Sequence, residues 1–147
     1  PNRTYLSGGA AVNWLEVGAS DWRGPDQLAA PFSNYGGQQV DVFAPGSQIL
    51  STAPGNAYEA ASGTSFAAPV VSGIAALLMS YFPELTATDV RRIIKDTATP
   101  LGDRMVQRPG AEEPELVRFG DLSITGGIVN AYAAVRMAER IVAERNP

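Results

Sequence analysis

An apolar stretch from Ser65 to Phe82 dominates the middle of the sequence, and only three serines interrupt its aliphatic, aromatic and small residues. Because apolar residues occur all round the helical period, the stretch predicts a helix that is buried on every side. Pro69 is compatible with this helix, since proline is tolerated in a first turn whose amides lack intrahelical acceptors. We expect the helix to begin between Thr64 and Phe66, and to need packing partners on both sides.

Short strand patterns precede this helix. Residues 12–20 form an aromatic and β-branched run that ends in Gly-Ala-Ser, which is typical of a strand entering a turn. Residues 21–37 are rich in proline, glycine and asparagine and predict a surface loop. Residues 40–46, "VDVFAPG", predict a second strand, and residues 47–63 predict two strands around the turn "PGN".

Two more helices are expected after the apolar stretch. Thr86 and Asp89 have the spacing of a capping box. The residues that follow place apolar side chains on one helical face and basic side chains on the opposite face, which is typical of a surface helix. Asn130 predicts the cap of a last amphipathic helix. Between these helices, the polar and proline-containing residues 100–120 predict a long loop, and residues 103–121 are expected to be a loop insertion.

Composition limits the classes of function. The 147 residues are long enough for one domain, and 45% hydrophobic composition excludes a disordered chain. With 11 basic and 15 acidic residues the net charge is −4, which argues against binding to nucleic acid or to an anionic membrane surface. The longest apolar run is shorter than the roughly 20 residues that cross a bilayer. The absence of cysteine excludes disulfides and thiolate chemistry.

Ser65 occupies a position with a specific chemical use. The free amides in the first turn of a helix point toward the place where a tetrahedral oxyanion would form, so a serine here suits both a nucleophile and an oxyanion donor. A simpler interpretation is that Thr64 or Ser65 only caps the helix, because such caps are common. Strands mixed with helices, one of them apolar throughout, predict an α/β fold with a mostly parallel sheet.

The block "GTSFAAP" at residues 63–69, followed by "VVSGIAALL", resembles the serine motif of the subtilisin-like serine peptidases, the subtilases. In that family the motif Gly-Thr-Ser-x-Ala-x-Pro opens a buried central helix. The blocks "LEVGAS", "FSNYGGQQVDVFAPGSQILST" and "GGIVNAYAAV" resemble other segments of the family in the same order. The resemblance implies that residues 1–147 are the C-terminal part of a subtilisin-like peptidase domain with a three-layer α/β fold.

The resemblance also implies the function. Ser65 would form an acyl-enzyme and donate its amide to the oxyanion, with Thr64 and Phe66 beside the substrate site. The triad aspartate and histidine and the oxyanion asparagine precede the serine in this family, and the chain has no histidine. We therefore expect a serine endopeptidase of proteins or peptides that is inactive as this fragment alone. Its missing partner would be the N-terminal half of the same domain, and its location secreted or periplasmic.

The sequence departs from the family pattern in several ways. Phe66 replaces the more frequent methionine, and the Gly-Asn pair that ends at Asn56 is expected to be a hairpin turn and not the oxyanion group. Asp21, Asp26 and Asp41 are expected to be turn or surface residues and not the triad acid. No cofactor is expected. The family allows structural calcium, but no run of carboxylates has calcium-ligand spacing, and the acidic cluster at residues 112–115 is expected to be a solvated loop.

Two other functions remain open at this point. The first is a non-catalytic pseudo-peptidase or binding module that keeps the subtilisin-like fold without the histidine in its missing half. The second is a sedolisin-like acid serine peptidase, in which a glutamate replaces the histidine, and a pH optimum near neutrality would exclude it. If the chain is half of a domain, it exposes a sheet edge and apolar helix surface, so the isolated chain is expected to form an oligomer or a strand-swapped dimer.

Overall fold

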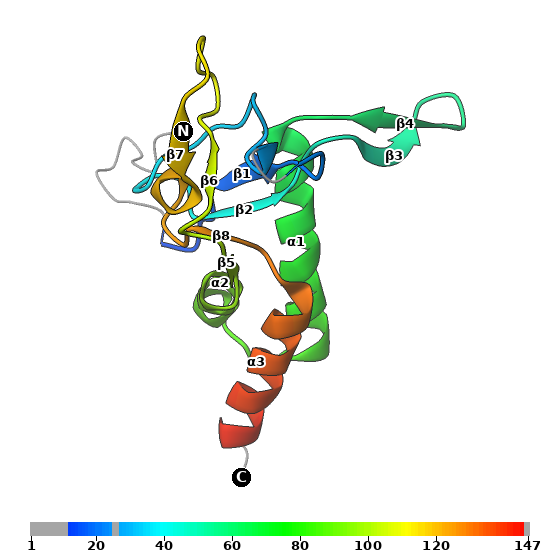
Figure 1. Ribbon diagram of the computed structural model, residues 1–147. Coiled ribbons are helices and arrows are strands. Elements are labelled where there is room, and N and C mark those ends of the chain that lie inside the picture. Colours follow the sequence, from blue (N-terminus) through cyan, green and yellow to red (C-terminus); the bar gives the residue numbers. More distant parts are fainter. Residues whose placement is uncertain (1–11, 25–26, 146–147) are drawn as a thin grey trace, which may run out of the picture.

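The computed structural model describes residues 12–24 and 27–145, and its centre is a four-stranded sheet (Figure 1). The strand order is β1 (Val17–Ser20), β2 (Val42–Pro45), β8 (Gly127–Ile128) and β5 (Thr99–Pro100). β1 and β8 both run parallel to β2, and β5 is antiparallel to β8. Three residues of β2 are buried, as expected for an apolar strand that is covered on both faces. The mostly parallel sheet of an α/β fold is thus confirmed.

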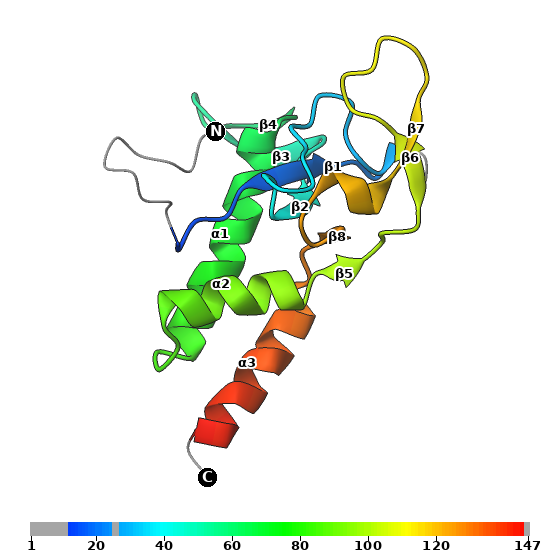
Figure 2. The same cartoon turned by 90° about the vertical axis from the view of Figure 1, so that its left-hand side faces the viewer.

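Three helices pack against one another, and the first of them also packs against β1 and β2 (Figures 1 and 2). They are α1 (Thr64–Tyr81), α2 (Ala87–Asp96) and α3 (Ala131–Arg145). The predicted capping box of α2 is present, because the Asp89 amide donates to Thr86 Oγ1 at 3.1 Å and the Thr86 amide to Asp89 Oδ2 at 3.0 Å. The Asn130 cap of α3 is confirmed by a 2.9 Å bond from the Ala133 amide. Local capping chemistry therefore starts both helices where the sequence predicts.

The opposite face of the sheet has a separate apolar core. Phe43 of β2 packs against Phe119 with ring centroids 4.8 Å apart, and Val106 and Leu122 are buried beside them. Val106 belongs to β6 (Met105–Gln107), which forms a hairpin with β7 (Leu116–Arg118), and Phe119 and Leu122 belong to the 3-10 helix η2 (Phe119–Leu122). The expectation of a long loop over residues 100–120 is therefore wrong: two short strands form there because Val106 and Phe119 are buried against the sheet.

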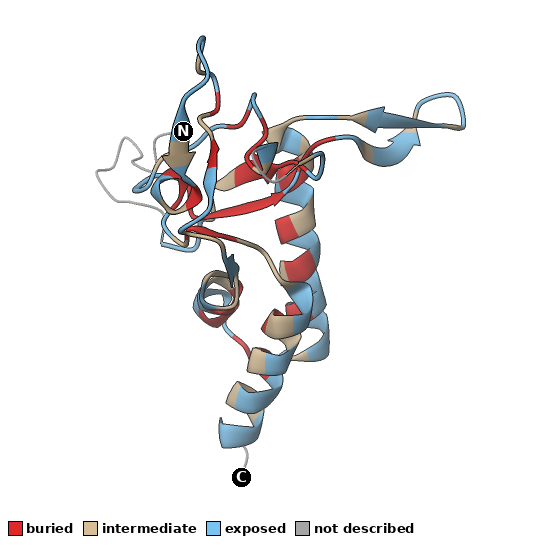
Figure 3. Cartoon of the chain, viewed as in Figure 1, coloured by how far each residue is buried: buried red, intermediate tan, exposed pale blue. Residues whose placement is uncertain are grey.

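The apolar helix is buried on one side only, as expected if the chain is half of a domain and leaves apolar helix surface exposed. α1 begins at Thr64 as predicted, but its buried residues form a single stripe of Ala67, Val71, Ile74 and Leu78 that faces the sheet and the other helices. Figure 3 shows this stripe on one side of α1, while the outward side is exposed. The residues described here supply partners for only one flank of the helix.

Two further features of α1 concern its surroundings. The strands β3 (Ile49–Ala53) and β4 (Ala57–Ala61) form the predicted hairpin, which projects from the body and leads directly into α1 (Figure 1). α1 is also long and apolar enough to cross a membrane by length and composition, a test that the core helix of a globular domain passes equally. Its buried stripe against β1 and β2 is what a core helix requires.

Candidate active site

The chain enters α1 at a point where β1, β2 and the helix meet. Gly46, directly after β2, accepts a 2.8 Å hydrogen bond from the Gly63 amide, and the Gly46 amide donates to Ser20 at the end of β1. A Cβ at Gly46 would lie 2.7 Å from the Cβ of Ala19 and 2.9 Å from the carbonyl oxygen of Gly63. Only glycine allows this approach, so Gly46 sets where the helix can start relative to the sheet.

Ser65 is exposed in the first turn of α1. The first amides that return to the preceding backbone are those of Phe66 and Ala67, which both donate to the Gly63 carbonyl oxygen. The Ser65 amide precedes them and belongs to the group of first-turn amides that have no acceptor within a helix. Its hydroxyl and amide therefore lie together at the positive end of an 18-residue helix.

A hollow of about 240 Å³ lies beside this serine. Ser65, Thr64 and Ala68 of α1 line it together with residues of the β1 segment and the neighbouring loop, which are Trp14, Leu15, Glu16, Val17, Asn34 and Val40. Asn34 donates a long, 3.5 Å hydrogen bond to Thr64 Oγ1. The structure thus places Thr64 and Ser65 on one wall of the same hollow, and Phe66 follows them half-buried.

The hollow lies along the outer edge of β1. At Ala19 this edge is closed, because its amide donates to Ser33 Oγ at 2.8 Å and its carbonyl accepts from Ala30 at 3.0 Å. Alternate residues of a strand direct their backbone groups to opposite edges, so Val17 directs its amide and carbonyl outward, toward the hollow. The short edge next to Ser65 is thus available for a further strand.

Two of the three aspartates expected at the surface are buried. Asp41 is fully buried and accepts from Lys95 Nζ at 2.9 Å, from Arg91 at 3.5 Å and from the Glu16 amide at 2.9 Å. Asp21 is buried and bound by the Arg23 guanidinium, which lowers the pKa of its carboxyl to about 2. Asp21 is nevertheless a turn residue, as one alternative of the prediction has it, because its Oδ1 accepts from the Arg23 amide at 3.0 Å. The turn or surface expectation is wrong for Asp41, whose burial is offset by its ion pairs, and Asp26 lies outside the described residues.

Neither aspartate offers a metal site. In the part of the chain that the structure describes, no three acidic, histidine or cysteine side chains gather around one point. The oxygens of Asp21 and Asp41 already accept hydrogen bonds from cations, which a calcium ion would have to displace. Glu112, Glu113 and Glu115 are exposed, and Glu115 pairs with Arg108. The carboxylates described here do not fit a calcium ion.

The Gly-Asn pair, Gly55 and Asn56, forms the turn between β3 and β4. Asn56 has a φ of 59° and is exposed at the tip of the β3–β4 hairpin, where the left-handed conformation closes the turn. The turn prediction for this pair is confirmed.

Comparisons with known proteins agree with this geometry. The family model described as "Subtilase family" matches residues 1–111. Subtilisin DY from Bacillus licheniformis is 44% identical over 89 residues, which are 60% of this chain and 31% of the relative. Alkaline elastase YaB from Bacillus sp. (strain YaB) is 38% identical over 125 residues, which are 85% of this chain and 28% of the relative.

Solved structures show the same fold. The self-cleaved protease domain of PatA has a TM-score of 0.63 and 32% identity, and the match covers 87% of this chain and 42% of that chain. A structure of the subtilase cytotoxin SubAB assembly has a TM-score of 0.65 and 26% identity, covering 86% and 37%. The chain belongs to the subtilase family of serine peptidases. It spans 31% and 28% of the length of the two curated relatives above.

Some positions that shape this site were missed by the sequence interpretation. Gly46 is part of the "APG" block, but its contact with Gly63 joins residues that are distant in sequence. The hydroxyl of Ser33, in the block "FSN", closes the edge of β1. Both lie in blocks that resemble the family, so the resemblance marked the segments without indicating what these side chains do.

Proposed function

We propose that this chain is the serine-bearing part of a serine endopeptidase and that Ser65 is its nucleophile. The observation that carries the proposal is the placement of Ser65, with an exposed hydroxyl and a first-turn amide at the same helix end, on the wall of an open hollow. A peptide carbonyl in this hollow would be attacked by the Ser65 hydroxyl, and its oxygen would develop negative charge toward the helix end. Thr64 and Phe66 would flank the reacting bond.

The chain does not hold a base for this reaction. It contains no histidine, and a serine hydroxyl has a pKa far above 7, so it is a poor nucleophile without an adjacent base. In the proposed mechanism an upstream histidine, oriented by an aspartate, takes the proton of Ser65 and returns it to the leaving amine. Water then hydrolyses the acyl-enzyme. The isolated chain would be close to inert.

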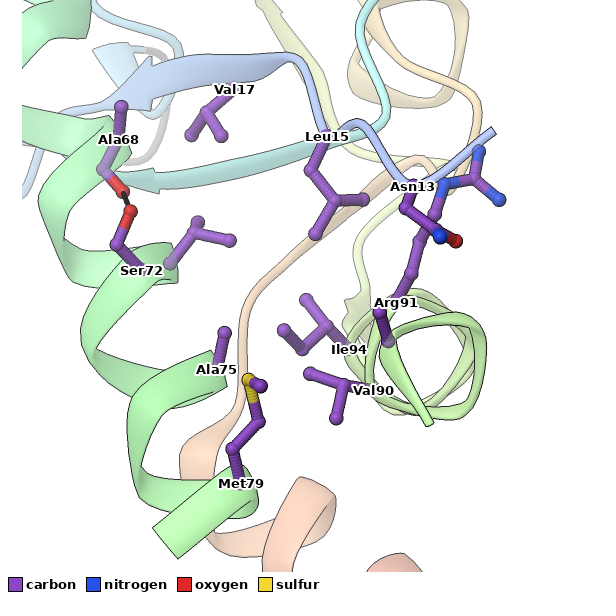
Figure 4. Close-up of a pocket in the computed structure, with 12 residues that line it drawn as sticks. Asn13, Leu15, Val17, Ala68, Ser72, Ala75, Met79, Val90, Arg91 and Ile94 are labelled. Atoms are coloured by element: carbon purple, nitrogen blue, oxygen red, sulfur yellow. Dashed lines mark hydrogen bonds between the residues drawn. The ribbon is translucent and has the colours of Figure 1, made fainter. Parts of the chain in front are cut away.

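The upstream half of the domain is the proposed partner of the uncovered flank. A groove of about 300 Å³ runs between α1 and α2 below β1 (Figure 4), and most of its lining side chains are apolar. Leu15 and Val17 enter it from the β1 segment, and Ala75 and Met79 from α1. The two curated relatives named above are more than twice as long as the segments that match this chain. The proposed occupant of the groove is therefore the segment that precedes this chain in the intact domain. A strand from that segment would pair with the open edge at Val17.

Similarity to Bacillus subtilisins also supports an exported location, secreted or periplasmic, for the intact protein. Its substrate would be a protein or peptide, which the similarity to alkaline elastase YaB and to the protease domain of PatA supports.

The experiment that tests the proposal is labelling of the longer source protein with a fluorophosphonate probe, followed by mapping of the modified residue. We expect one label per chain at Ser65 and complete loss of labelling in Ser65→Ala. Ser80→Ala, which removes another exposed serine of α1, is the matched control and should label normally.

A longer protein that fails to label would contradict the proposal and leave a non-catalytic binding module as the function. The pH dependence of labelling separates the remaining mechanisms. A rate that increases through neutral pH is expected for a histidine base, whereas labelling confined to acidic pH would indicate the sedolisin-like mechanism.

A further inference from the structure

Two segments lie side by side at the base of the β3–β4 hairpin, just before Ser65. The outgoing segment, Gly46 to Gln48, leads from β2 into β3, and the returning segment, Ser62 and Gly63, leads from β4 into α1. We propose that Ser62 is a positioning residue of the active site: its hydroxyl ties the returning segment to the outgoing one and thereby fixes the first turn of α1. This inference rests on Ser65 being the nucleophile.

The Ser62 hydroxyl joins the two segments through two contacts with one residue. The backbone amide of Gln48 donates to Ser62 Oγ at 2.8 Å, and the side-chain Nε2 of Gln48 donates to the same oxygen at 3.4 Å. A hydroxyl oxygen has two lone pairs, so it can accept both. One residue further along, the Gly63 amide donates to the Gly46 carbonyl at 2.8 Å. Two consecutive residues before the helix are therefore tied to the segment that links β2 to β3.

The conformation of Gln48 indicates that this tie is needed. Its φ is 54°, in the left-handed region that non-glycine residues rarely adopt. Such a conformation persists when surrounding contacts over-determine it. It turns the Gln48 amide toward Ser62, and the pairing of Ile49 with Ala61 then begins the hairpin ladder. Loss of the Ser62 oxygen would remove the acceptor of this amide and loosen the base of the hairpin.

The hairpin itself provides little other support. It projects from the body (Figure 1), and both of its strands have mostly exposed residues. A two-stranded hairpin in water is only marginally stable. The contacts at the base of the hairpin are therefore the ones that can hold Ser62 and Gly63, and with them Ser65, in a fixed position. Catalytic groups must be held within about 0.5 Å of their productive geometry, so looseness at Ser62 should reduce the rate of attack by Ser65.

The test uses the longer source protein with three substitutions in the same hairpin region. Ser62→Ala removes the hydroxyl, Ser62→Thr keeps it, and Ser51→Ala removes an exposed hydroxyl in β3 of the same hairpin as a control. The readouts are the rate constant of fluorophosphonate labelling, and kcat and KM for one peptide substrate. Hydrogen exchange of the Gln48 amide reports the tie directly.

We expect Ser62→Ala to lower both kcat and the labelling rate about tenfold, with KM changed less than about twofold, because displacement of the reacting atoms affects the chemical step. The Gln48 amide should exchange faster in this variant. Ser62→Thr should restore most of the rate and the protection, and Ser51→Ala should match the wild type.

Labelling of Ser62→Ala at the wild-type rate would overturn the inference, and so would a loss of rate that Ser62→Thr does not restore. Failure of the proposed function gives a different result, because the wild-type protein itself would then not label at Ser65. Since Ser62 is exposed, its truncation leaves the apolar cores intact, and thermal melting of each variant verifies that the fold is retained.

Discussion

The two flanks of α1 differ in how much support they receive. The inward flank holds the buried stripe and the helix start, which Gly46 and Gly63 tie to the ends of β1 and β2. Away from this stripe, Leu77, Met79 and Tyr81 are 39%, 53% and 74% exposed. The comparison teaches that the described residues fix the start of α1 and leave part of its surface uncovered; in the proposed function, the parts that cover the helix and activate Ser65 come from the rest of the intact protein.

The largest stability effect is expected at Asp41, which joins elements that pack against the inward flank of α1. This buried carboxylate joins the segment before β2 to Lys95 and Arg91 of α2. Asp41→Asn keeps the shape of the side chain and removes its charge, so two half-buried cations lose their partner. We expect the free energy of unfolding to fall by about 2–4 kcal/mol, measured by urea denaturation.

Glu139→Gln is the control for this substitution, because it removes one carboxylate of the exposed Arg136–Glu139 pair. It should leave the denaturation midpoint almost unchanged. An equal loss of unfolding free energy in Asp41→Asn and Glu139→Gln would contradict the claim that the buried carboxylate contributes more stability than the exposed one.

A smaller loss is expected at Gly46. In Gly46→Ala the added methyl group would meet Ala19 and the Gly63 carbonyl, so β2 and the helix start must separate. We expect a loss of about 1–3 kcal/mol in unfolding free energy, together with slower labelling of Ser65 in the longer protein. Gly55→Ala is a poor control because Gly55 has a positive φ, whereas Gly24→Ala meets no neighbouring atom and should be neutral. Normal stability and normal labelling in Gly46→Ala would sink this account of the helix start.

The acid dependence of stability should come partly from Asp21. Its pKa in the folded chain is lowered from 3.8 to about 2 by the Arg23 guanidinium. The ion pair therefore contributes stability above about pH 4, and this contribution is lost as the pH falls toward 2. Because Arg23 is half exposed, we expect about 1 kcal/mol. Asp21→Asn should lose this amount at pH 6, and a difference from wild type that persists at pH 2 would contradict the assignment.

The uncovered flank should show almost no stability effect and a change in association instead. Met79 is exposed and lines the groove between α1 and α2. We expect the isolated chain to self-associate at micromolar concentration, and Met79→Glu to shift it toward monomer in light scattering with its unfolding free energy unchanged. Tyr132→Glu on α3 is the control. A wild-type chain that is monomeric throughout would show that this surface does not drive association.

Local signals predicted much of the fold. The start of α1, the capping box of α2, the Asn130 cap and the turn at Asn56 all depend on residues close together in sequence, and all are confirmed. The β6–β7 hairpin was missed because each of its strands has only three residues and prolines lie between them. Its burial depends on Phe43, which is distant in sequence.

The part of the candidate site that could be predicted also consists of residues that are close together in sequence. Ser65, Thr64 and Phe66 follow from one contiguous motif, and the resemblance assigned them together. The burial of Asp41 and the ties at Gly46 and Ser62 depend on partners that only the fold brings near. The exposed side of α1 was expected only from the resemblance to half of a domain, because the apolar composition of residues 65–82 by itself predicts burial on every side.

The central claim is that this chain positions Ser65 but does not activate it. The most direct measurement is the rate of fluorophosphonate labelling of the purified chain and of the longer source protein, at equal concentration and pH, read by intact mass. The account predicts labelling at Ser65 in the longer protein and almost none in the isolated chain. Labelling of both at the same rate would contradict it, because the base would then have to lie within residues 1–147.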